Sequence, residues 1–168
     1  MSLAEHPYCE ICPIVENPPP LDLDFRIYEG DAWRATLREN QALLGTTYVT
    51  LKQHKESLEE LTATEREELW TIYDGLSKAV KGVFSADLVN FSCLMNLAYR
   101  PTGDPNFVPQ PHVHWHFKPR YSGDRRVGGE TFTDPEFGSY LKLSRTQNVS
   151  LPVGGLIVAN MKAHFALT

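Results

Sequence analysis

The chain has 168 residues, of which 42% are hydrophobic and 22% are charged, and its formal net charge is −5. These values describe one soluble globular domain, large enough to bury about 70% of the surface of its unfolded chain. The charge argues against broad binding of nucleic acid or anionic membranes, and no apolar run approaches the ~20 residues of a membrane span. The start lacks a signal-peptide pattern, and three cysteines, an odd number, favour a reducing compartment such as the cytoplasm.

The first motif along the chain is the pair Cys9-x-x-Cys12. Two cysteines at this spacing supply half of a tetrahedral zinc site, so two further ligands have to come from distant positions. A redox disulfide is a rival interpretation, but no βαβ pattern surrounds the pair as a thioredoxin-like motif requires. The third interpretation is a pair of thiols that binds no metal. We expect His6 to be a bystander and Cys93 to be buried in the core.

The next segments predict strands. A stiff connector at 17–20 precedes segments 25–28 and 33–37, which predict a hairpin around a Glu-Gly-Asp turn. Segment 45–51 predicts a third strand, which ends at Lys52-Gln53-His54. A histidine at a strand end can be a ligand, a phosphate donor or plain surface, and we expect a functional role for His54.

One helix has a clear predicted start and a clear apolar face. Thr64-x-x-Glu67 is a capping box, and apolar residues recur at three- and four-residue steps up to Phe84. The acidic first turn suits the positive end of the helix dipole and needs no catalytic explanation. A fourth strand is predicted at 87–96, followed by a proline-rich loop at 100–109.

The stretch from His112 to Phe117 alternates three of the six histidines with Val113, Trp115 and Phe117. On a strand this spacing puts three imidazoles on one face and three apolar groups on the other. Two adjacent imidazoles can share one metal ion, but all three hardly can. A second interpretation is nucleophilic attack on a phosphate, because an imidazole with a pKa near its usual value of about 6.5 is largely neutral at pH 7. The third interpretation is a histidine-rich strand without a function.

Together with Pro119-Arg120-Tyr121, this stretch resembles the signature of the histidine triad family, whose members are nucleotide hydrolases and transferases. Lys118 stands where the signature has an apolar residue. The resemblance extends upstream to Cys9 and covers about 9–121. It implies an α+β fold, with an antiparallel sheet and the 64–84 helix packed across one face. We expect a single domain, 1–168, in which about 122–168 form a C-terminal extension.

The resemblance also implies roles for individual residues. His114 would attack an α-phosphorus and form a nucleotidyl-histidine, while its other ring nitrogen donates to a backbone carbonyl. Donors to the substrate would be His112, His116, Asn96, Gln110 and His54. The ligands of a structural zinc ion, which the chemistry itself does not need, would be Cys9, Cys12, His54 and His112.

The implied activity is hydrolysis or nucleotidyl transfer at a phosphoanhydride or phosphoramidate bond, as in diadenosine polyphosphate hydrolases. The implied ligand is a small nucleotide, and family members generally form homodimers. A zinc-stabilised nucleotide-binding module with weak or no catalysis is the alternative. A metallohydrolase that uses two of the triad histidines is a third reading.

Three positions depart from the family pattern. Val108 stands where relatives carry a glutamine before the triad, and Gln110 lies two residues closer to it. Arg38 stands approximately where relatives hold the ribose hydroxyls with an acid, and it cannot accept those hydrogen bonds. The loop from Asn96 to His112 is longer than usual. Beyond the triad, we expect 122–129 to be mobile, with Arg125-Arg126 as a solvated pair, and a helix from Ser150 to Phe165.

Overall fold

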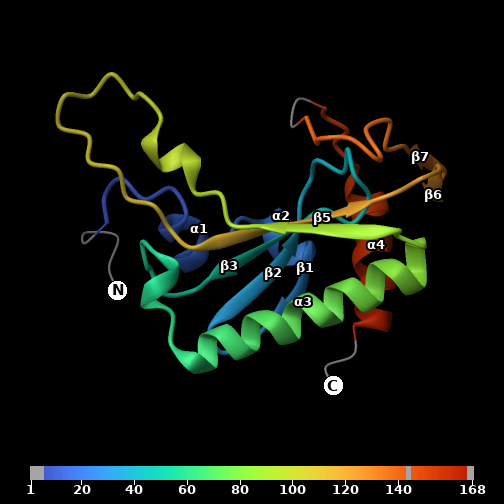
Figure 1. Cartoon of the computed structure of the whole chain (residues 1–168), viewed down its shortest axis with the longest axis horizontal. Helices are drawn as coiled ribbons and strands as arrows, with labels where there is room; N and C mark the ends of the chain where they lie inside the picture. Colours follow the sequence, from blue (N-terminus) through green and yellow to red (C-terminus); the bar gives the residue numbers. More distant parts are fainter. Residues whose placement is uncertain (1–5, 143–144, 166–168) are drawn as a thin grey trace.

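The computed structural model describes residues 6–142 and 145–165 and confirms the expected α+β fold. A five-stranded antiparallel sheet has the order β1-β2-β3-β5-β4. Its strands are β1 (Arg26–Glu29), β2 (Trp33–Leu37), β3 (Thr47–Leu51), β5 (His114–Arg120) and β4 (Leu88–Ser92). The long helix α3 (Ala63–Phe84) runs beneath the sheet (Figure 1). The shorter elements are α1 (Cys12–Glu16), α2 (Pro20–Asp24), η1 (Leu58–Glu60), η2 (Asn96–Tyr99), β6 (Arg125–Val127), β7 (Glu130–Phe132) and α4 (Leu151–His164).

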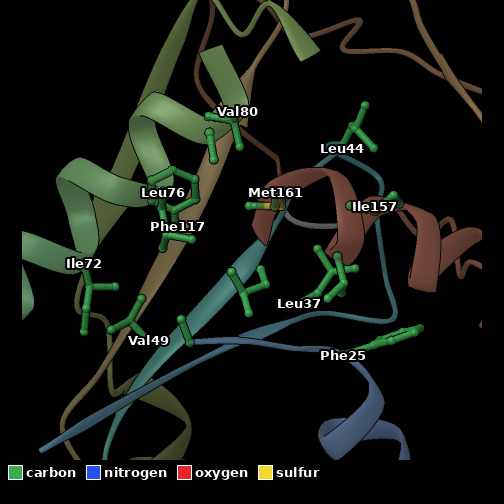
Figure 2. Close-up of a cluster of buried hydrophobic side chains, with 14 of the residues drawn as sticks. Phe25, Leu37, Leu44, Val49, Ile72, Leu76, Val80, Phe117, Ile157 and Met161 are labelled. Atoms are coloured by element: carbon green, nitrogen blue, oxygen red, sulfur yellow. The ribbon is translucent and has the colours of Figure 1, made fainter. Parts of the chain in front are cut away.

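The two faces of the sheet differ because the strands alternate between buried and half-buried residues. In β2 and β3 the first, third and fifth residues are buried and the second and fourth are half-buried. The buried side chains meet the apolar stripe of α3 in one core, which includes Leu37, Val49, Ile72, Leu76, Val80 and Phe117 (Figure 2). The helix therefore covers one face and leaves the other to polar side chains.

The C-terminal residues belong to the same core. The expected C-terminal helix is confirmed as α4, which begins after Ser150 and packs against α3 and β1. Ile157 and Met161 are fully buried in this core, and Met161 lies near Leu76 and Val80 of α3 (Figure 2). A Cβ atom at Gly154 would lie 2.1 Å from the Phe25 ring, so only glycine lets the helix approach this ring. No helix in the described part of the chain is both long and apolar enough to cross a membrane.

The start of α3 differs from the expected capping box. Thr62 is the N-cap, its hydroxyl accepts a hydrogen bond from the Glu65 amide, and the Glu65 carboxylate accepts one from the Thr62 amide. Thr64 lies inside the helix. Both registers fit the Thr-x-x-Glu pattern, but Glu65 also forms a buried ion pair with Lys55 at 2.6 Å. This tertiary contact selects the earlier register.

Two strand boundaries also differ from expectation. β4 ends at Ser92, because Met95 takes a left-handed backbone with φ 49° and starts η2 with Asn96. Cys93 is therefore half-buried rather than part of the core. The triad strand β5 begins at His114, so His112 lies in the irregular segment before it.

The segment expected to be mobile after Tyr121 forms a hairpin, β6–β7, whose turn contains Gly128 and Gly129 with positive φ. Arg125 is not a solvated cation. Its guanidinium donates to the carbonyl oxygens of Phe84 at 2.6 Å and Ser85 at 2.8 Å, and so caps the C-terminus of α3. Arg126 is exposed, as expected.

Candidate functional site

Four residues from three separate parts of the chain form a buried group that we call the Cys2His2 cluster: Cys9, Cys12, His54 and His112. Each is less than 8% exposed, at 4%, 7%, 6% and 2% respectively. Their potential ligand atoms all lie within 4.8 Å of one another. The fold thus brings together the four residues that were expected to bind zinc.

The distances within the cluster fit a tetrahedral metal site. The Cys12 Sγ atom lies 3.3 Å from His54 Nδ1 and 3.6 Å from His112 Nδ1, and Cys9 Sγ lies 3.5 Å from His112 Nδ1. In a tetrahedral zinc site with usual bond lengths, sulfur and nitrogen ligands are about 3.6 Å apart. The Cys12 amide also points at Cys9 Sγ, at 3.4 Å. The donor set and its geometry both fit zinc.

The remaining ring nitrogens of the cluster are oriented from outside. His112 Nε2 lies 2.7 Å from the Leu51 carbonyl oxygen, and His54 Nε2 lies 3.5 Å from Glu56 Oε1. The Leu51 carbonyl fixes the ring orientation and tautomer of His112, whereas the Glu56 carboxylate lies near His54 Nε2 without a hydrogen bond to it. His6, expected to be a bystander, stacks on His54 with ring centroids 3.6 Å apart. Burial lowers the pKa of His112 to about 4 and raises the pKa of Cys12 to about 12, so without a metal both groups favour their neutral forms.

The other two triad histidines lie on the open face of the sheet. His114 pairs with Thr50 of β3, and His116 lies between Tyr48 of β3 and Ser92 of β4. The rings of His114 and His116 are 5.0 Å apart, and the Tyr48 ring lies 4.6 Å from His116. The two imidazoles therefore share one surface, as the alternation predicted. The prediction that His112 shares this face is wrong, because His112 precedes the strand and its ring nitrogens face the two thiols and the Leu51 carbonyl.

His114 holds a defined tautomer. Its Nδ1 atom lies 2.8 Å from the His112 carbonyl oxygen, which can only accept a hydrogen bond. Nδ1 therefore carries the proton and Nε2 is left with a free lone pair. This confirms the expected hydrogen bond to a backbone carbonyl. Burial lowers the pKa of His114, so the ring stays neutral and nucleophilic at neutral pH.

A cavity of about 640 Å³ lies over this face. Its floor is formed by β2, β3 and β5, and its walls by the N-terminal Cys-x-x-Cys loop, η2 with the following loop, and segment 134–145 as far as it is described. Figure 1 shows the loop after β4 and the segment after β7 rising from the sheet on the side opposite α3. The cavity is large enough for a nucleotide-sized ligand.

The expected substrate-binding residues fall into two groups. Asn96 and Gln110 line the cavity together with His114 and His116, whereas His54 does not border it. Gln110 accepts a hydrogen bond from the Tyr8 amide at 2.7 Å, so its Oε1 atom holds the N-terminal loop in place. His54 lies behind the wall, in the Cys2His2 cluster.

The cavity also contains residues that the sequence did not single out as binding groups. The Arg38 guanidinium lies 4.2 Å above the Tyr48 ring, and Lys118 follows His116 on the same face of β5. Burial, together with the charges of His114, Lys118 and Arg38, lowers the pKa of His116 to about 4. The two-residue alternation of β5 indicated that Lys118 shares the face of His114 and His116, but it gave no signal for Arg38, which follows the end of β2.

The Pro-Arg-Tyr motif connects the triad strand to the rest of the core. Arg120 forms an ion pair with Asp134 at 2.6 Å, and both side chains are nearly inaccessible. The Tyr121 hydroxyl donates to the Leu44 carbonyl at 2.7 Å. Asp134 thereby fixes the start of the segment that walls the cavity.

Comparisons with known proteins give the fold. No family model matches the chain, and no curated protein matches its sequence. A hypothetical histidine triad nucleotide-binding protein from Sulfolobus tokodaii has a TM-score of 0.63 at 20% identity, covering 94% of this chain and 91% of its own. A zinc-bound histidine triad family protein from Mycobacterium smegmatis has a TM-score of 0.58 at 22% identity, covering 92% and 94%.

A uridylyltransferase mutant is also similar, with a TM-score of 0.61 at 19% identity. The similarity covers 97% of this chain but 48% of the uridylyltransferase. The chain thus has the fold of the histidine triad proteins over most of its length, as its motif implied.

Proposed function

We propose that the chain is a nucleotide hydrolase or nucleotidyl transferase that acts through a nucleotidyl-histidine on His114. The observation that carries this proposal is the hydrogen bond from His114 Nδ1 to the His112 carbonyl, at 2.8 Å, which leaves Nε2 as a free nucleophile. The zinc-bound and nucleotide-binding proteins of the same fold support the class of activity.

In the proposed reaction, the lone pair of His114 Nε2 attacks the α-phosphorus of a nucleotide. A P–N bond forms while the bond to the leaving group breaks, and water then cleaves the P–N bond to release the nucleoside monophosphate. Splitting one displacement into two lowers the barrier of each step. His116, Asn96 and Gln110 supply donors to phosphate oxygens and to the leaving group. We propose that the bond cleaved is a phosphoanhydride or a phosphoramidate.

We further propose that the Cys2His2 cluster binds a structural zinc ion rather than a catalytic one. Two cysteines and two histidines complete a tetrahedral coordination shell and leave no position for a substrate or a water molecule. The geometry argues against the metallohydrolase reading, because His112 turns both ring nitrogens away from the cavity, toward the thiols and toward Leu51. His112 would hold the metal and position His114 through its carbonyl group.

The test is the His114→Ala variant, assayed with diadenosine tetraphosphate and with adenosine 5′-phosphoramidate. We expect the loss of at least about three orders of magnitude in kcat, because the nucleophile is removed. Mass spectrometry of the acid-quenched native enzyme should find an adenylyl group on the peptide containing His114. Turnover that survives in His114→Ala would disprove the mechanism.

The same assay separates the alternative, a zinc-stabilised nucleotide-binding module without catalysis. Such a module would bind nucleotide tightly and release no product. A chelator distinguishes the role of the metal: loss of folding together with zinc indicates a structural ion, whereas loss of activity alone indicates a catalytic ion.

The expected homodimer also remains a proposal. β4 is an edge strand with no partner on its outer side among the described residues. Its own Leu88 is 42% exposed, and Trp70 of α3, whose ring contacts Phe91 of β4, is 54% exposed. Unpaired strand edges with apolar neighbours favour pairing with another chain. We expect light scattering to give the mass of a dimer and Trp70→Asp to weaken it. The free thiols of all three cysteines suit a reducing compartment such as the cytoplasm.

A further inference from the structure

We propose that Arg38 and Lys118 determine specificity by selecting a substrate that carries a second phosphate beyond the one attacked by His114. This inference rests on the proposed function, because it concerns the substrate of the same site. The second phosphate can come from the leaving group of a polyphosphate or from a phosphorylated ribose. Both sources present anionic phosphate oxygens to the two cations.

The positions of the two cations follow from the strand register. His114, His116 and Lys118 succeed one another along the open face of β5. Phe117 pairs with Thr47, and the Arg38 amide donates to the Thr46 carbonyl at 2.9 Å. The register therefore places Lys118 and Arg38 in the next row of the sheet beyond His116, with Thr46 between them. Lys118 and His114 are about 13 Å apart along the strand, a span that long side chains and a chain of phosphates can bridge.

These two cations have no acidic partner within the described residues, whereas two other cations that border the cavity do. Arg34 is paired with Glu29, and Arg100 is paired with Glu10. The cavity carboxylates are mostly engaged as well: Asp134 binds Arg120, and Glu136 accepts a hydrogen bond from the Lys142 amide. Asp22, the remaining carboxylate of the cavity lining, forms no ion pair with Arg38 or Lys118. The positive charge of this row is therefore not neutralised by the protein, although the chain as a whole has a net charge of −5.

The electrostatics of the site favour the binding of an anion. Burial lowers the pKa of the Lys118 amine, because water is removed and no carboxylate replaces it. The charge of Arg38 also lowers the pKa of His116. An anionic group bound in this row would offset the repulsion among these groups. A leaving group that is a neutral or protonated amine would not offset this repulsion.

The test compares two substrates that transfer the same adenylyl group: diadenosine tetraphosphate and adenosine 5′-phosphoramidate. The variants are Arg38→Met and Lys118→Met, and the control is Arg126→Met, which removes an exposed cation of β6 outside the cavity. We expect kcat/KM for the tetraphosphate to fall about tenfold or more in each variant, because each loses one charged hydrogen bond. Activity on the phosphoramidate should change less than about threefold, and Arg38→Lys and Lys118→Arg should recover most of the loss.

An equal loss on both substrates would overturn the inference, and no loss on either would exclude the leaving group as the source of the second phosphate. Failure of the proposed function is distinguishable, because it would leave the wild type inactive on both. In that case the anion site can still be tested by measuring the unfolding temperature with and without inorganic tripolyphosphate. The site is supported if tripolyphosphate raises the unfolding temperature of the wild type and of Arg126→Met but not that of Arg38→Met or Lys118→Met. No stabilisation of the wild type by tripolyphosphate or by adenosine 3′,5′-bisphosphate would refute it. Stabilisation by adenosine 3′,5′-bisphosphate instead of tripolyphosphate would support the ribose phosphate as the source.

Discussion

His112 and His114 are separated by one residue, yet they lie in different environments. His112 precedes the strand, is 2% exposed and turns its Nδ1 atom to two thiols. His114 begins β5, in the floor of the cavity, and its Nε2 atom is free of hydrogen bonds. The carbonyl group of the first histidine accepts the ring proton of the second. In our proposal, the first site is a closed metal centre that holds the chain rigid, and the second is an open nucleophile that this rigidity positions.

The largest expected effect distinguishes these two histidines directly. His114→Ala should abolish turnover while leaving zinc content and unfolding temperature close to wild type. His112→Ala should release zinc and destabilise the fold by roughly 3 kcal/mol or more, because it opens the metal site. Metal analysis and calorimetry on both variants check this, with Cys93→Ser, outside the cluster, as the control. If both variants keep their zinc, the division between the two sites is wrong.

The next effect concerns the wall of the open site. Asp134→Ala leaves Arg120 buried without its partner, and we expect a loss of about 3–5 kcal/mol in the free energy of unfolding. Urea unfolding measures it. Asp124→Ala removes an exposed carboxylate from the neighbouring turn and should change the stability by less than about 0.5 kcal/mol. Similar losses in the two variants would show that the ion pair does not hold this segment.

The acid dependence of stability is a smaller effect. Burial lowers the pKa of His116 to about 4, so between pH 6.5 and 4 the unfolded chain binds a proton that the folded chain does not. Stability therefore falls as the pH falls through this window, by on the order of 2 kcal/mol from this residue. The groups facing His116 are His114, Tyr48, Lys118 and Arg38. Unfolding of His116→Gln at a series of pH values should show a shallower slope; an unchanged slope would assign the effect to other groups.

The smallest effect tests the outer shell of the closed site. Glu56 lies 3.5 Å from His54 Nε2 and is half exposed. We expect Glu56→Gln to weaken zinc binding by about tenfold, because a carboxylate on the second ring nitrogen raises the basicity of the ligand. Competition with a chromogenic chelator measures the affinity. Glu59→Gln, on the same exposed turn, is the matched control and should leave the affinity unchanged.

The sequence alone determined the alternating features of this protein. Period-two alternation predicted the strands and the shared face of His114 and His116, and the three- and four-residue steps predicted α3. These patterns are local, because each depends only on how side chains project from a strand or a helix. The pair Cys9-x-x-Cys12 indicated half of a metal site, and the remaining ligands came only from the resemblance.

The tertiary structure decided what depends on contacts between distant residues. It turned His112 toward Cys9 and Cys12. Through the Lys55–Glu65 ion pair it selected Thr62 rather than Thr64 as the helix cap. It also ended β4 before Asn96. It also placed Arg38 and Lys118 in one row of the sheet, which no spacing in the sequence could reveal, because strand register is set by pairing between segments far apart in the chain.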